Sequence, residues 1–182
     1  MAHWQVFSPD HEFPGQVMVD LANAVGIEEI MPYFEKHGMT KIDPKAWYPQ
    51  QTLLDIFNDM DDSKKGAMFD LVSIGIKEAE QAIVPPYFES LPMLSILQGI
   101  GEVFKLNNRG TDPGEIKCET VTDKHVKIIL RVPTPDDLWY GIFYGFVRRF
   151  IPKGTHFRVN FDPDEKRREF GGALTIIHIS WD

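Results

Sequence analysis

The chain has 182 residues, of which 43% are hydrophobic and 25% are charged, and this composition is typical of one folded domain with a sizeable core. Its formal net charge of −8 disfavours nucleic-acid binding, because proteins that bind nucleic acid neutralise phosphates with a basic surface. A single cysteine excludes an internal disulfide and a multi-cysteine zinc site, and it favours a reducing cytoplasm.

The first two-thirds of the chain carry helical signals. Apolar residues spaced three and four apart, with glycine and proline at the boundaries, predict helices over residues 17–26, 27–37, 50–60, 63–83 and 87–104. Asp43 followed by Pro44 is typical of a further helix start, as is Pro49 before the third helix. The stripe in 63–83 is the most regular and indicates one continuous buried face.

Beyond a linker over residues 105–114, the apolar period changes from helical to two. Alternation predicts strands over residues 116–121, 126–132, 157–161 and 173–181. Between the second and third strands, Thr134 before Pro135 predicts a capped helix over 135–150. Gly141 and Gly145 on that helix are expected to let it pack closely on the sheet.

These elements predict an α+β fold in one domain over residues 1–182. A helical lobe over 1–106 would be followed by a β-β-α-β-β lobe over 114–182. Short turns between neighbouring strands imply an antiparallel sheet, with helices covering one side of it.

No catalytic or metal-binding constellation emerges from the residues. The histidines are scattered singly, at His3, His11, His37, His125, His156 and His178. His156 and His178 could be neighbours across the sheet, but two imidazoles without a third ligand make a poor zinc site. There is no nucleophile elbow and no glycine-rich phosphate loop after a strand, so an enzyme is the least favoured class.

Three stretches of sequence carry a family resemblance: residues 139–150 (WYGIFYGFVRRF), 171–176 (GGALTI) and 42–49 (IDPKAWYP). They resemble the ligand-binding fold shared by haem nitric-oxide-binding sensors, four-vinyl-reductase-type domains and small Golgi tethering subunits. The resemblance implies a cavity between a helical lobe and a sheet, and a tendency of two copies to pair.

The chain departs from each branch of that superfamily at the residues that define its chemistry. The haem sensors carry a proximal histidine on the helix before the first strand, where this chain places Ser95 and has no histidine. Their Tyr-x-Ser-x-Arg propionate clamp is replaced by residues 131–135 (RVPTP). The zinc-binding branch has cysteines near the last strands, where this chain has none. The tethering subunits acylate a cysteine on the helical side, whereas Cys118 falls on a predicted strand.

The resemblance therefore predicts a non-catalytic sensor or carrier of an apolar or tetrapyrrole-like molecule, bound between helix 87–104 and the sheet. The expected ligand-binding residues are Phe88, Leu91, Leu94, Ser95, Leu97, Ile100, Ile128 and Leu130. The cofactor stays unknown. Haem is possible but not favoured, and a haem gas sensor would need an unusual axial ligand such as His37 or one supplied by a partner. A scaffold or tethering subunit with a filled cavity is the other alternative.

The remaining expectations concern partners and location. The resemblance implies a homodimer, and a chain without a second domain would need a separate effector protein. The first residues lack the basic and apolar regions of a signal peptide, and no stretch reaches the ~20 apolar residues of a membrane span. A cytoplasmic protein that binds a small molecule, without nucleic acid and without a membrane span, is expected.

Overall fold

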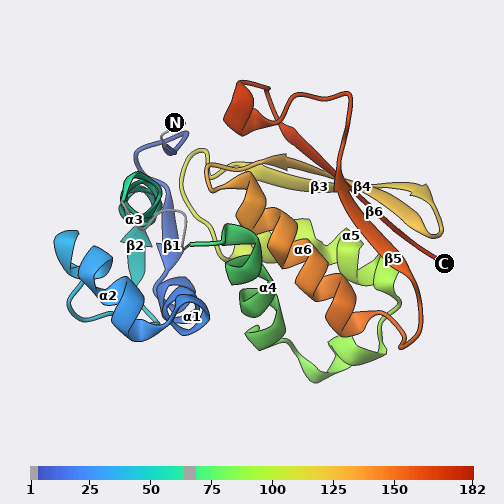
Figure 1. The fold of residues 1–182 in the computed structure, drawn as a ribbon, viewed down its shortest axis with the longest axis horizontal. Helices are drawn as coiled ribbons and strands as arrows, with labels where there is room; N and C mark the ends of the chain where they lie inside the picture. The colour runs from blue at the N-terminus through green and yellow to red at the C-terminus, as the bar shows by residue number, and fades with distance from the viewer. Residues whose placement is uncertain (1–3, 64–68) are drawn as a thin grey trace.

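The computed structural model describes residues 4–63 and 69–182, and it confirms an α+β fold (Figure 1). The helices are α1 (Gln16–Val25), α2 (Ile27–Lys36), α3 (Gln50–Asp62), α4 (Leu71–Gln81), α5 (Met93–Leu106) and α6 (Asp136–Phe150), with 3-10 turns at Pro86–Ser90 and Arg168–Phe170. The strands are β1 (Glu12–Pro14), β2 (Trp47–Pro49), β3 (Glu115–Thr122), β4 (His125–Arg131), β5 (Phe157–Phe161) and β6 (Thr175–Trp181).

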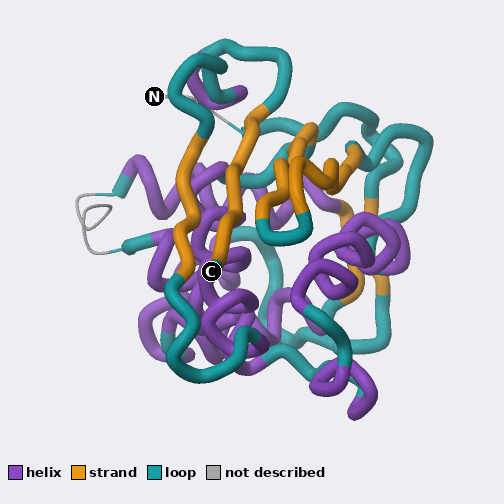
Figure 2. The backbone as a smooth tube through the Cα atoms, turned by 90° about the vertical axis from the view of Figure 1, so that its right-hand side faces the viewer, coloured by secondary structure: helices purple, strands orange, loops and turns teal. Residues whose placement is uncertain are grey.

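The larger sheet has four antiparallel strands in the order β3-β4-β6-β5. Along β4, Val126, Ile128 and Leu130 are buried, whereas Lys127 and Ile129 between them are partly exposed. This alternation confirms that one face packs on helices, and α5 and α6 lie on that side (Figures 1 and 2). No described helix has the length and apolar character needed to cross a bilayer.

Two hydrophobic cores lie on either side of α6. The N-terminal core joins α1, α2, α3 and part of α4, and includes Phe13, Leu21, Phe57, Ile74 and Leu138. The sheet core joins α5 to the four-stranded sheet, and includes Ile100, Phe104, Ile128, Phe143 and Ile177. Because Leu138 and Phe143 are both on α6, this helix contributes to both cores.

The helix predicted over residues 87–104 is wrong in its first part. A 3-10 turn ends at Ser90, Leu91 is extended, and α5 begins only at Met93. Pro92 explains the break, because proline disfavours the helical conformation of the residue before it and donates no backbone N–H. At the other end α5 extends through Leu106, into the stretch predicted as linker.

Three other sequence predictions also need correction. Asp43 does not start a helix; its Oδ1 accepts from Lys45 N–H (2.9 Å) in a tight turn before β2. Thr134 does not cap α6, because its Oγ1 accepts from Trp139 Nε1 (2.7 Å). The predicted helix over 63–83 is helical only over α4; Ile83 is 96% exposed, and residues 64–68 lie outside the described part of the chain.

Helices α4 and α6 cross at very short range through glycines. A Cβ atom added to Gly141 would lie 2.1 Å from Val72 O, and one added to Gly75 would lie 2.2 Å from Leu138 O. Gly145 likewise approaches Ala79. The expectation that Gly141 and Gly145 pack on the sheet is therefore wrong, since they pack on α4.

A small two-stranded ribbon was not predicted. Strands β1 and β2 pair over three residues each, and Glu12 also bridges to Arg109 through two backbone hydrogen bonds of 2.8 and 3.0 Å. The ribbon therefore ties the N-terminal segment to the connection between α5 and β3. It also fixes His11, the residue just before β1, beside that connection.

Candidate functional site

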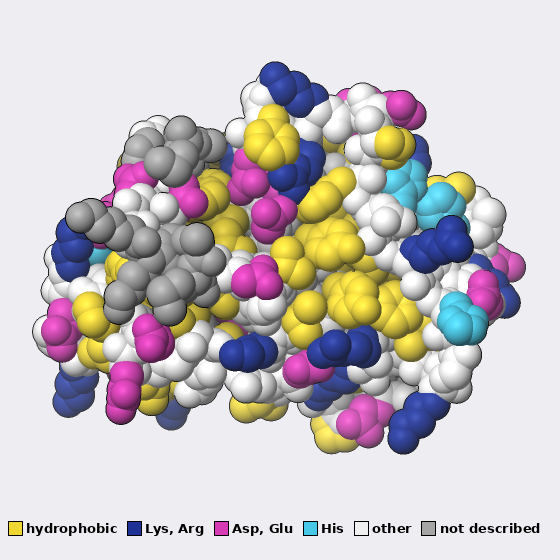
Figure 3. All heavy atoms as spheres, in the orientation of Figure 1, with side chains coloured by type: hydrophobic (Ala, Val, Ile, Leu, Met, Phe, Trp, Pro, Cys, Tyr) yellow, Lys and Arg dark blue, Asp and Glu magenta, His cyan; other side chains and the backbone are white. Residues whose placement is uncertain are grey.

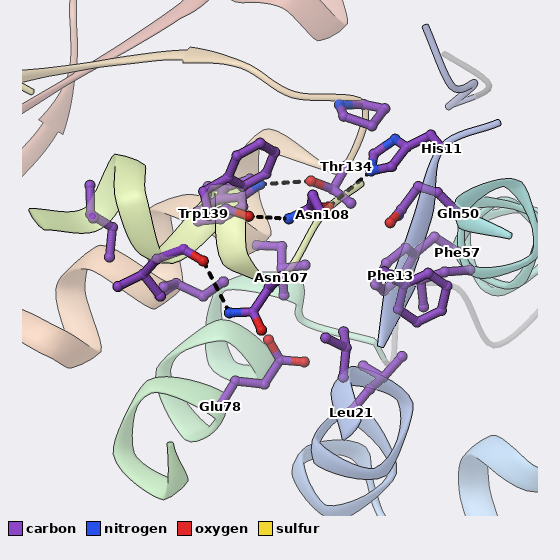
Figure 4. Close-up of a pocket in the computed structure, with 18 of the residues that line it drawn as sticks. His11, Phe13, Leu21, Gln50, Phe57, Glu78, Asn107, Asn108, Thr134 and Trp139 are labelled. Atoms are coloured by element: carbon purple, nitrogen blue, oxygen red, sulfur yellow. Dashed lines mark hydrogen bonds between the residues drawn. The ribbon is translucent and has the colours of Figure 1, made fainter. Parts of the chain in front are cut away.

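A cavity of about 210 Å³ lies where the two cores meet. Residues from β1, α1 and α3 line one side and residues from α5 and α6 line the other, with α4 below them in the close-up (Figure 4). The walls are largely apolar and rich in aromatic rings, including Phe13, Leu21, Phe57, Phe104, Trp139 and Phe146. This combination of shape and lining is typical of a small-molecule site.

His11 is a buried, neutral imidazole at the cavity. Its Nε2 lies 2.9 Å from Asn108 Oδ1, and Asn108 Nδ2 donates to Phe104 O (2.9 Å). Because Asn108 Oδ1 is thus the acceptor, His11 Nε2 carries the proton and Nδ1 keeps a bare lone pair. Burial lowers the pKa of His11, and its Nδ1 has no partner among the described residues.

Gln50 reaches the cavity from the first residue of α3. It is 2% exposed, and its side-chain oxygen points toward the cavity (Figure 4). Its backbone N–H donates to His11 O (2.8 Å), so these two polar residues are held together. Gln50 Nε2 has no partner among the described residues, which leaves a buried donor unsatisfied.

Glu78 on α4 places a carboxyl group beside the same cavity, near Asn107 (Figure 4). Burial, followed by the negative charge of Asp20, raises the pKa of Glu78 to about 8. No hydrogen bond from a described residue lowers this pKa. The side chain therefore holds a proton that an ordinary glutamate would have lost at neutral pH.

The cations close to α4 are engaged elsewhere. Lys77 Nζ donates to Ala24 O (3.0 Å), and Arg148 pairs with Glu80 on the exposed side of the helix. Arg149 Nη1 donates to the carbonyl oxygens of Ala79, Glu80 and Ala82 at the end of α4, at 2.8 to 3.2 Å. None of these described cations neutralises Glu78.

Of the eight expected ligand-binding residues, the structure places Ile100 on the cavity wall. Leu97, Ile128 and Leu130 are buried in the sheet core, and the partly buried Phe88, Leu91 and Leu94 pack against it. Ser95 is exposed. The cause is the direction of α5, which turns Ile100, Val103 and Phe104 toward the cavity. Ligand binding at the other seven residues stays a prediction.

The sequence analysis missed His11, Gln50 and Glu78. Glu78 did leave a signal, because it follows the buried Ile74 by one helical turn and so lies close to the buried face of α4. A carboxylate on such a face is uncommon enough to mark a site. His11 and Gln50 come from distant segments and have no comparable spacing. His37 does not line the cavity; its Nε2 contacts Asp59 Oδ2 (2.6 Å).

A chain of polar contacts lies outside the cavity on the larger sheet. His178 Nδ1 lies 2.8 Å from His125 Nε2, and His178 Nε2 lies 2.8 Å from Asp162 Oδ2. The expected proximity of His156 and His178 is thus replaced by this arrangement, because His178 pairs with Asn160 across β5 and β6. Among the residues described, no group of His, Cys, Asp and Glu could hold a metal ion.

The sequence matches no protein-family model, and no curated protein matches it. Solved structures do match. A double mutant of the Tt H-NOX domain aligns with a TM-score of 0.69 at 14% identity, over 93% of this chain and 95% of that chain. An H-NOX structure from a study of heme distortion aligns at 0.67 and 15%, over 92% of each chain.

A third similar structure is the oxygen complex of an oxygen-binding H-NOX domain related to soluble guanylate cyclases. It aligns with a TM-score of 0.64 at 16% identity, over 92% of each chain. Sequence identities this low establish a shared fold only. Which ligand this chain binds has to be argued from its own residues. The chain has the fold of H-NOX domains over nearly its whole length.

Proposed function

We propose that this chain is a small-molecule-binding sensor or carrier domain that holds its ligand in the cavity between the two cores. The observation that carries the proposal is the aromatic-lined cavity of about 210 Å³ with buried, unpartnered polar atoms at its wall. An H-NOX fold supports it, since the matched structures include an oxygen-binding domain. Such polar atoms are costly to bury unless something satisfies them.

Native mass spectrometry of the purified protein, paired with its absorption spectrum, tests this proposal. A retained small molecule supports ligand binding, and visible absorbance would identify it as a pigment. Replacing Ile100 by phenylalanine is expected to fill part of the cavity and reduce retention, because the added ring occupies ligand volume. Val121→Phe, on an exposed position of β3, is the control. A bare protein that no added molecule stabilises would favour the scaffold alternative.

A haem-binding gas sensor is the second candidate. Structures of H-NOX domains studied for their heme support it, and so does the presence of His11 at the cavity. In their present arrangement the residues do not fit haem. Helix α5 has no histidine, His11 Nε2 is engaged by Asn108 Oδ1, and Arg131 is hydrogen-bonded to both carboxylate oxygens of Asp112 at 2.8 Å.

Titration with hemin tests the haem candidate directly. A sharp Soret band that is lost in His11→Ala and kept in His37→Ala would support it, because only the former residue lines the cavity. Weak, unspecific absorbance that is equal in the wild type and both variants would reject it.

The proposal also keeps four expectations from the sequence. The chain would form one domain with the two predicted lobes, would lie in the cytoplasm, would pair with a second copy, and would act on a separate effector protein.

Hydrophobic side chains gather on the face over α6 and β5 (Figure 3), where Tyr140 packs on Phe161 and Tyr144 packs on Phe157. Such a surface suits contact with another protein. Sedimentation velocity gives the oligomeric state, and a monomer at all concentrations would reject the homodimer.

A further inference from the structure

The cavity presents hydrogen-bond acceptors that have no donors to pair with. The carboxyl group of Glu78 and the side-chain oxygen of Gln50 reach the cavity from different helices, α4 and α3. Both are hydrogen-bond acceptors when Glu78 is ionised. Neither oxygen has a donor among the described residues, and Asp20 on α1 adds further negative charge near Glu78. Once Glu78 is ionised, the cavity therefore offers acceptors and negative potential to whatever occupies it.

The aromatic part of the cavity wall also favours a positively charged ligand. Aromatic rings attract cations through their faces, and Phe13, Phe57, Phe104, Trp139 and Phe146 all line the cavity. Described cations that could compete for Glu78 are held by other groups, namely Lys77 by Ala24 O and Arg149 by the carbonyl oxygens at the end of α4. Burial lowers the pKa of His11 and so favours its neutral form, and its Nε2 is engaged by Asn108 Oδ1.

We propose that the cavity binds a small organic amine in its protonated form, with the ammonium group on Glu78 and an apolar body against the aromatic wall. The inference rests on the proposed ligand-binding function and narrows it to one chemical class. A purely apolar ligand would leave the Glu78 carboxyl without a hydrogen-bond partner, whereas an ammonium group supplies both charge and donors.

Isothermal titration with three matched probes of the same size tests this class: benzylamine, benzyl alcohol and toluene. The wild type is expected to bind benzylamine at least about tenfold more tightly than either neutral probe, because the charge-assisted bond forms only with the amine. Glu78→Gln is expected to abolish that preference while it still binds toluene. Glu80→Gln, on the exposed side of the same helix, is expected to keep it.

The pH dependence supplies a second readout. Burial raises the pKa of Glu78 to about 8, so benzylamine affinity should rise as pH increases toward 8 and the empty carboxyl loses its proton. Toluene affinity should stay flat across the same range. Asp20, on the facing helix α1, is the other acidic group that raises the pKa of Glu78.

The outcomes separate the two proposals. Toluene or benzyl alcohol binding as tightly as benzylamine would overturn the amine class and leave the ligand-binding function standing. A benzylamine preference that survives in Glu78→Gln would overturn the assignment of its partner. If no probe binds and the purified protein retains nothing, both the amine class and the ligand-binding function are wrong.

Discussion

Glu78→Gln is expected to stabilise the empty protein at neutral pH. Burial raises the pKa of this carboxyl from 4.5 to about 8, so the native state binds the proton more tightly than the unfolded chain. The free energy of unfolding of the wild type should therefore fall as pH rises from about 4.5 to 8 and level off above that window. At pH 7 the loss is roughly 3 kcal/mol, which an uncharged amide avoids.

Urea unfolding at pH 5, 7 and 9 measures this effect. Relative to the wild type, the variant should be more stable at pH 7 and 9. The difference should shrink toward pH 5, where the glutamate of the unfolded chain also begins to bind the proton. Glu80→Gln provides the control, because Glu80 is exposed and paired with Arg148. A difference between Glu78→Gln and the wild type that does not change with pH would show that the Glu78 carboxyl titrates normally.

Gly141→Ala is expected to destabilise the protein by about 3 kcal/mol or more, although alanine is ordinarily the better helix former. The new methyl group would lie 2.1 Å from Val72 O, so α4 and α6 would have to separate along their contact. Because that neighbour is backbone rather than a flexible side chain, local adjustment cannot relieve the clash. Thermal unfolding followed by circular dichroism measures the change.

Gly99→Ala is the matched control for this prediction. Gly99 also lies within a helix, but nothing lies within 4 Å of an added Cβ atom. The Gly99→Ala substitution should raise the free energy of unfolding by up to about 1 kcal/mol, because alanine restricts the unfolded chain more than glycine does. Equal effects at the two positions would contradict the close crossing of α4 and α6.

The sheet lobe could be predicted because its signals are local. Each of its strands alternates over at least five residues, and the turn after Thr122 is short. Strands β1 and β2 have three residues each, too few for a period to show. The break before α5 depended on one residue, Pro92, within a continuous apolar pattern.

The candidate site could be predicted only in outline. Ile100 belonged to a visible helical stripe and lines the cavity. His11, Gln50 and Glu78 come from three segments far apart in the chain, and only tertiary packing brings them to one cavity. Their partners are decided by distances, such as the 2.9 Å between His11 and Asn108, which no spacing in the sequence encodes.

The position of α6 between the two cores has a kinetic and mechanical consequence. Since Leu138 packs in one core and Phe143 in the other, the two cores cannot change their spacing without moving α6. A ligand that pushes the cores apart would move this helix on the microsecond to millisecond scale of collective motions. Because Tyr140 packs on Phe161 and Tyr144 packs on Phe157, the same movement would carry occupancy of the interior to strand β5.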